Sequence, residues 1–154
     1  MVSRLRQWIG NRSDDAQLVA TLQEVLRFNL RCAVHYPRMA ELVKQTNPDP
    51  ELQGLLLEWG SEQLKCAEEV GFLITKLGSE PLWISDCRAD EFESHDFFAL
   101  EVIRQSKALA RLQDAVVLAA GTSIQQRISD LASGEEQRLQ ELVVIQKRIY
   151  GSKD

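Results

Sequence analysis

The stretch Leu131-Ala-Ser-Gly-Glu-Glu-Gln-Arg-Leu-Gln-Glu-Leu142 lies in the last predicted helix and decides how the chain folds. An apolar stripe runs through it in alternating steps of four and three residues, the spacing of one face of a packed helix. The stripe positions are Ile124, Ile128, Leu131, Glu135, Arg138, Leu142, Ile145 and Ile149. A carboxylate and a guanidinium therefore stand where two apolar residues are expected, and a buried charge is costly unless it is paired or bound to a metal.

A second stripe, in residues 50–77, is interrupted in the same way. Its positions are Leu56, Trp59, Gln63, Cys66, Val70, Leu73 and Leu77. Gln63 and Cys66 take the two central places, and a spacing of three residues puts both side chains on one face of a helix. Glu24 and Glu101 lie near the middle of the two other long segments. The sequence therefore predicts one buried polar layer to which four helices contribute.

Caps and helix breakers divide the rest of the chain. Ser13-Asp14-Asp15 is typical of a helix start, Pro48 and Pro50 end one helix, and Gly78 suits the end of the next. No stretch has the alternation of a strand, so we expect an all-α protein of one domain. The expected segments are a short N-terminal helix within 1–13, helices at 15–44, 50–77, 96–120 and 123–150, and a crossover at 79–95.

The crossover determines the topology. It has 17 residues, and at about 3.3 Å per residue an extended chain of that length spans the whole bundle. The helices before and after it are then parallel, whereas the two tight connections leave their helices antiparallel. A four-helix bundle with one long crossover is the arrangement of ferritin-like folds.

Composition limits the possible partners. The chain has 154 residues, 44% apolar and 27% charged, as soluble globular domains do. Its net charge of −5 argues against nucleic acid. No apolar run is long enough for a signal peptide or a membrane span, and the expected location is the cytoplasm. The basic start (Arg4, Arg6 and Arg12, with Trp8 and Ile9) favours a helix docked on the body over a targeting segment.

Cysteine and histidine usage excludes two kinds of site. Cys32, Cys66 and Cys87 are odd in number and widely spaced, which fits neither a disulfide framework nor a zinc motif. His35 and His95 are too few for a zinc or copper cluster of their own. Structural roles are favoured for both histidines and for Cys32 and Cys87.

Four motifs carry a resemblance to a known family. They are Gln63-Leu-Lys-Cys-Ala67 followed by Leu77-Gly-Ser-Glu-Pro81, Gly134-Glu-Glu-Gln-Arg-Leu139, Glu24-Val-Leu-Arg-Phe-Asn29, and Ala99-Leu-Glu-Val102. Over roughly residues 15–150 the chain resembles the ferritin-like superfamily, and bacterioferritins most closely. In such proteins Glu residues bridge two metal ions and Glu-x-x-His pairs bind them at the ends.

The resemblance implies a ligand set that is only half retained. The candidate metal ligands are Glu24, Glu101, Glu135 and Cys66, with Gln63 and Arg138 at two further ligand positions. Gln63 replaces a Glu, whereas Cys66 and Arg138 replace the two His. Arginine stays protonated and cannot be a ligand. Arg31 also stands where the family usually has an aromatic residue.

Further departures concern haem and assembly. Leu64 stands where bacterioferritins carry the haem-binding methionine, so no haem is expected. The sequence closes near the end of the last helix and leaves no room for a fifth helix of the kind that lines cage axes. We therefore expect a homodimer through the sides of the 15–44 and 50–77 helices rather than a ferritin cage, with any further protein partner open.

Three hypotheses about function follow. In the first, the di-iron site is lost, a Glu/Arg network replaces it, and the bundle is a metal-free interaction or regulatory protein with no cofactor and no catalytic residues. In the second, an altered set of Glu24, Glu101 and Glu135 with Cys66 or His35 binds iron or another divalent metal, and the protein is an iron-handling protein, a ferroxidase or a di-metal oxidase.

The third hypothesis is a small-molecule or lipid pocket between the helices. Its lining would come from Phe28, Trp59, Phe72 and Trp83, although core packing explains these aromatic residues more simply. No Ser/His/Asp constellation, glycine-rich phosphate loop or nucleotide fingerprint occurs in the sequence.

Overall fold

The computed structural model describes the backbone of residues 2–85 and 97–151, and the side chains of residues 15–85 and 97–149. Four helices make up nearly all of it: α1 (Val2–Thr46), α2 (Pro50–Lys76), α3 (Phe97–Leu118) and α4 (Gln125–Gly151). No strand occurs in these two ranges. The predicted all-α fold class is confirmed.

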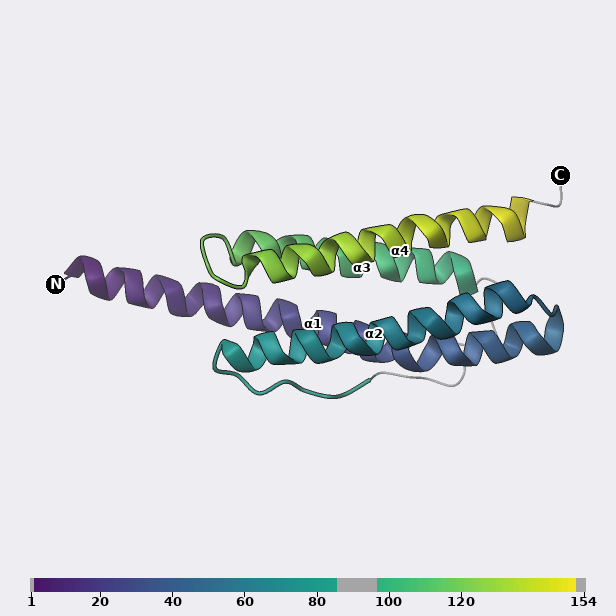
Figure 1. The fold of residues 1–154 in the computed structure, drawn as a ribbon. Coiled ribbons are helices and arrows are strands. Elements are labelled where there is room, and N and C mark those ends of the chain that lie inside the picture. The colour runs from purple at the N-terminus through teal and green to yellow at the C-terminus, as the bar shows by residue number, and fades with distance from the viewer. Residues whose placement is uncertain (1, 86–96, 152–154) are drawn as a thin grey trace.

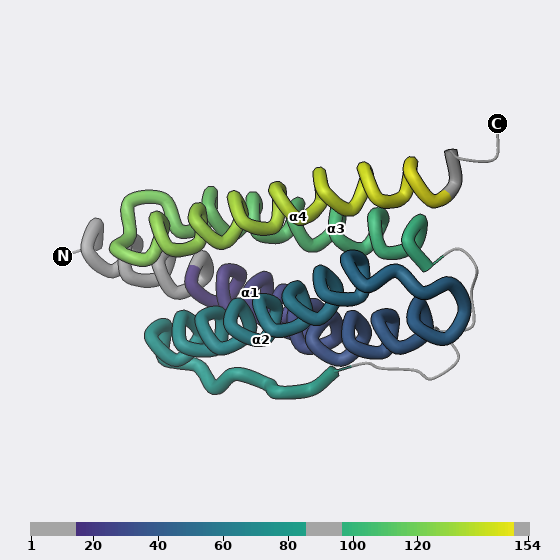
Figure 2. Tube along the Cα trace, turned by 45° about the vertical axis from the view of Figure 1, so that its right-hand side comes forward, coloured from purple at the N-terminus to yellow at the C-terminus, as the bar shows by residue number. Residues whose placement is uncertain are grey.

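The order of the helices in space is that of a bundle with one long crossover. Helices α1 and α2 form one antiparallel pair, and α3 and α4 form the other (Figure 1). After α2, residues 79–85 run back along the first pair, and α2 and α3 point in the same direction (Figures 1 and 2). The structure therefore has the crossover topology that the length of the connection predicts.

Local chemistry explains where the helices begin and end. The carboxylate of Asp49 accepts a hydrogen bond from the Leu52 backbone N–H at 3.1 Å and caps α2, and Pro50 follows in the first turn. Gly78 (φ 85°) and Gly121 (φ 79°) follow α2 and α3 in the left-handed conformation that favours glycine. The bounds of α2, α3 and α4 differ by at most two residues from those expected.

The N-terminal segment differs from expectation. Residues 2–13 continue α1 as one helix of 45 residues and do not form a separate short helix. No proline interrupts this part of the chain, and a lone glycine such as Gly10 costs a helix only about 1 kcal/mol. The side chains of residues 1–14, which were expected to dock on the body, lie outside the described part of the structure, as do Cys87 and His95.

Two apolar clusters fill the bundle, one toward each end. The first contains Leu22, Leu26, Val70, Ile74, Leu112 and Ile128. The second contains Tyr36, Met39, Leu56, Trp59, Phe98 and Leu142. Every helix contributes to both clusters, and a buried polar side chain lies between them on each helix: Asn29, Gln63, Glu101 and Glu135. This interval is where the functional side chains lie.

Candidate functional site

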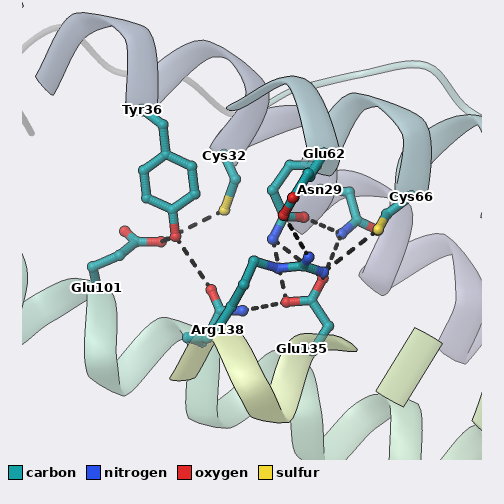
Figure 3. A network of polar contacts seen from close by, with 10 residues as sticks. Asn29, Cys32, Tyr36, Glu62, Cys66, Glu101, Glu135 and Arg138 are labelled. Atoms are coloured by element: carbon teal, nitrogen blue, oxygen red, sulfur yellow. Dashed lines mark hydrogen bonds and ion pairs between the residues drawn. The ribbon is translucent and has the colours of Figure 1, made fainter. Parts of the chain in front are cut away.

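A layer of buried polar side chains lies where the two apolar clusters meet and includes Cys32 and Tyr36 of the second cluster. We define the mid-bundle layer as the residues joined by one set of polar contacts (Figure 3): Asn29, Cys32, Tyr36, Gln63, Cys66, Glu101, Gln105, Glu135 and Arg138. All four helices contribute to it. Asn29, Gln63, Glu101, Gln105 and Glu135 are at most 2% exposed. Burial of this many polar groups is costly unless they hydrogen-bond to one another.

Glu135 is the acceptor at the centre of the layer. Arg138 donates from Nη2 to Oε1 at 2.6 Å, and Gln63 donates from Nε2 to both oxygens at 3.2 Å. Gln105 also donates from Nε2 to Oε2. A carboxylate offers about four acceptor positions, and donors from α2, α3 and α4 therefore account for nearly all of them.

Arg138 ties α4 to α2. Its Nη1 donates to Glu62 Oε2 at 3.2 Å, and its Nη2 lies 3.5 Å from Cys66 Sγ. Burial alone would lower the pKa of Arg138, but the adjacent Glu135 carboxylate outweighs it and holds the pKa above its ordinary value. Burial raises the pKa of the Cys66 thiol, although Arg138 opposes this. The layer therefore contains a permanent cation beside a protonated thiol.

A second group of contacts surrounds Glu101. Tyr36 Oη lies 3.2 Å from Glu101 Oε1 and 3.3 Å from Gln105 Oε1, and Cys32 Sγ lies 3.5 Å from Glu101 Oε1. Burial raises the pKa of both Tyr36 and Cys32 well above their ordinary values, so both are protonated donors at neutral pH. Gln105 joins the two groups, because its amide accepts from Tyr36 and donates to Glu135.

The α1 side of the layer is an amide. Asn29 donates from Nδ2 to Gln63 Oε1 at 2.6 Å, and the same nitrogen lies 3.5 Å from Glu135 Oε1. Gln63 is thereby fixed in orientation, with its oxygen toward α1 and its nitrogen toward α4. The result is a directed chain of hydrogen bonds from α1 through α2 to Glu135.

Glu101 gives the layer a pH dependence. Burial raises its pKa from the ordinary value of 4.5, and the charges of Arg31 and Arg104 only partly oppose this. A raised folded-state pKa stabilises the fold below the unfolded-state pKa, and this contribution is lost as pH rises through the folded-state value.

We expect Glu101→Gln, which cannot ionise, to gain stability relative to the parent chain as pH rises above 4.5. Urea unfolding at several pH values measures the difference; a difference that does not change with pH would contradict the assignment.

The structure gathers most of the residues singled out in the sequence. Glu101, Glu135, Gln63 and Arg138 lie in the layer, and Cys66 is at its half-buried margin. Glu24 does not join them: its side chain is 60% exposed and pairs with Arg111 Nε at 3.1 Å. The placing of Glu24 in the buried layer is therefore corrected. Among the described residues, no three His, Cys, Asp or Glu side chains gather as a metal-binding group.

The sequence-based prediction of the polar layer does not include four of its residues: Asn29, Cys32, Tyr36 and Gln105. The spacing of the buried stripes could have identified them. On α1 the buried positions Leu18, Leu22, Val25, Asn29, Cys32, Tyr36 and Met39 follow steps of four and three. On α3 the positions Phe98, Glu101, Gln105, Ala108 and Leu112 do the same.

The four aromatic residues of the third hypothesis do not form one pocket. Trp59 is buried and packs edge-on against Tyr36 with ring centroids 6.0 Å apart. Phe72 and Trp83 are more than half exposed. Trp83 lies against Gly71 of α2, where an added Cβ would meet its ring at 2.5 Å. These residues pack locally and do not line one cavity.

Comparison with known proteins identifies the fold. No protein-family model matches the chain, and no curated protein sequence does. The chain is similar to a crystal structure of the bacterioferritin of Desulfovibrio desulfuricans, which describes a diiron site in different catalytic states. The TM-score is 0.79 at 12% sequence identity, over 92% of this chain and 84% of that one. The fold is thus ferritin-like, of the bacterioferritin kind. No helix within the described residues is long and apolar enough to cross a membrane.

Proposed function

We propose that this ferritin-like bundle is a metal-free interaction or regulatory protein, in which the mid-bundle layer replaces a two-metal site. The observation that carries the proposal is Arg138, whose guanidinium lies 2.6 Å from Glu135 inside the layer. Arginine has no lone pair for a metal ion and keeps its charge in proteins. The positive charge that compensates Glu135 is thus supplied by the chain itself.

The donor set supports the same conclusion. A ferritin-like two-metal site uses four carboxylates and two histidines, whereas the layer supplies two carboxylates, Glu101 and Glu135. The acceptor positions of Glu135 are taken by N–H donors. Cys66 would have to lose its proton to bind a metal, and burial opposes that loss. These residues do not fit a pair of divalent ions.

An iron-handling protein or di-metal oxidase is the second candidate. It is favoured by the similarity in fold to a bacterioferritin with a diiron site. Glu101, Glu135 and Cys66 are the side chains that would hold a metal, and Arg138 would have to leave Glu135 first. Arg138 already contacts the carboxylate of Glu62, which is 40% exposed, and could pair with it after leaving Glu135.

Metal retention separates the two candidates. The purified chain is incubated with excess iron(II) in air, and separately with manganese(II) and zinc(II), then desalted and assayed for metal and for the rate of iron(II) oxidation. The expected result is far less than one metal ion per chain and an oxidation rate equal to that of buffer. The comparison variant, Gln63→Glu with Cys66→His and Arg138→His, restores both Glu-x-x-His pairs and should retain more metal. Stoichiometric metal with accelerated oxidation in the parent chain would establish the second candidate instead.

We also propose that the protein is a cytoplasmic homodimer through the sides of α1 and α2. The support is on the outer face of α2, where Leu57 and Leu64, one heptad apart, are 52% and 47% exposed. Exposed apolar side chains at this spacing suit a helix-to-helix interface. Sedimentation equilibrium of the chain and of Leu57→Lys tests it, and a monomeric parent chain would refute it.

A further inference from the structure

A cavity of about 830 Å³ opens between α1 and α3, away from the centre of the mid-bundle layer. Basic side chains dominate its lining: Arg27, Arg31, Arg104, Lys107 and Arg111. Two carboxylates, Glu24 and Asp114, are the acidic members. In a chain whose net charge is −5, this is a local excess of the opposite sign. A concave basic surface attracts anions and raises their local concentration.

The two carboxylates are already engaged with one of the cations. Arg111 lies 3.1 Å from Glu24 and 3.3 Å from Asp114, at an exposed edge where all three side chains are more than half exposed. Arg104 is only 22% exposed and lies 3.9 Å from Glu101. The basic lining therefore extends from an exposed, ion-paired rim to a half-buried arginine beside the mid-bundle layer.

The cavity also has an apolar part. Phe28 is half-buried, and Ala108 and Ala110 are the other apolar residues of the lining. The volume falls within the range of small-molecule sites, which combine an apolar lining with a few well-placed polar groups. A bare inorganic anion would leave the apolar part unused.

We propose that this cavity binds a small organic phosphate, with its phosphate on the arginines and its apolar body against Phe28. Guanidinium groups match phosphate oxygens in pairs, which makes arginine the preferred residue for phosphate recognition. Several such groups from two helices can surround one phosphate. The site is distinct from Glu135 and Arg138, and it adjoins the mid-bundle layer where Arg104 lies beside Glu101.

Phenyl phosphate and inorganic phosphate are paired probes, because a phenoxy group in the first replaces one hydroxyl of the second. Each is titrated into the full-length protein in a calorimeter at near-physiological salt. We expect saturable binding of phenyl phosphate, about tenfold tighter than that of inorganic phosphate. Lys107→Glu should weaken phenyl phosphate binding about tenfold or more. Lys147→Glu, the same charge change at an exposed site on α4, should change it little.

Two further measurements complete the test. Ala110→Trp fills the cavity without altering charge and should abolish binding, while circular dichroism confirms that the variant is folded. Vesicles of phosphatidylglycerol supply the same phosphate chemistry as a lipid headgroup. The proposal is overturned if phenyl phosphate does not saturate, if Lys107→Glu and Lys147→Glu weaken binding equally, or if only vesicles bind.

Discussion

Replacing Arg138 with leucine is expected to lower the free energy of unfolding by about 3–5 kcal/mol, the cost of leaving a buried charge uncompensated. Glu135 is 1% exposed and would keep the amide donors of Asn29, Gln63 and Gln105 but no positive charge beside it. Leucine matches the apolar stripe of α4, so the loss would not come from helix propensity or from a polar residue in the core. Urea unfolding followed by circular dichroism measures the effect.

Arg111→Leu is the matched control. Arg111 also pairs with two carboxylates, Glu24 and Asp114, but all three side chains are more than half exposed. An exposed ion pair is worth roughly 0–1 kcal/mol, and the control should lose no more than that. If Arg138→Leu also lost less than about 1 kcal/mol, the layer would not be held together by charge compensation.

The size of this difference bears on what the layer does for the fold. Buried ion pairs often add little net stability, since their desolvation offsets their attraction, but they can fix the register of packed helices. Here the polar side chains of four helices meet between two apolar clusters, of which the first is aliphatic and the second also contains Tyr36, Trp59 and Phe98. A shift of one helix by one turn would leave Glu135 opposite apolar residues. We therefore expect the layer to favour one alignment of the helices.

The sequence predicts the helices and their topology because stripe spacing, caps and connection length are local properties. It also predicts the interrupted positions of α2 and α4, since Gln63 and Glu135 fall on regular stripes. Glu24 shows where motif matching fails. The stripe of α1 passes through Val25 and Asn29, and one residue is a rotation of about 100° around a helix. Glu24 therefore faces the surface, although its motif resembles that of a ligand.

The partners within the layer are not local properties. From the sequence alone, Gln105 could be an exposed amide and Tyr36 an ordinary core aromatic residue. They contact Glu135 and Glu101 because of how α1, α3 and α4 are positioned along the bundle. The direction of each amide is also set by neighbours, as Asn29 sets that of Gln63. The three- and four-residue spacing of buried positions can identify such residues as candidates, but their contacts depend on how the helices pack.

Gln63→Glu is expected to destabilise the protein at pH 7 by roughly 2–4 kcal/mol, because it replaces two hydrogen bonds with a like charge in a buried site. Gln63 donates to both oxygens of Glu135 at 3.2 Å, and a carboxylate of the same shape cannot. The deficit should shrink as pH falls, since the introduced carboxyl can then take up a proton and donate a hydrogen bond to Glu135. Unfolding curves between pH 4 and pH 7 follow this change.

Gln45→Glu provides the same chemical change at the surface. Gln45 donates to Glu41 at 3.4 Å, four residues away on an exposed face of α1. Like charges at that spacing cost only about 0.2–0.5 kcal/mol. Divalent metals then test whether Arg138 can be displaced, because a metal ion could use the added carboxylate. If manganese(II) or zinc(II) restored the stability of Gln63→Glu but not that of Gln45→Glu, one added carboxylate would be enough for the mid-bundle layer to accept a metal ion, and Arg138 would be a removable counter-charge.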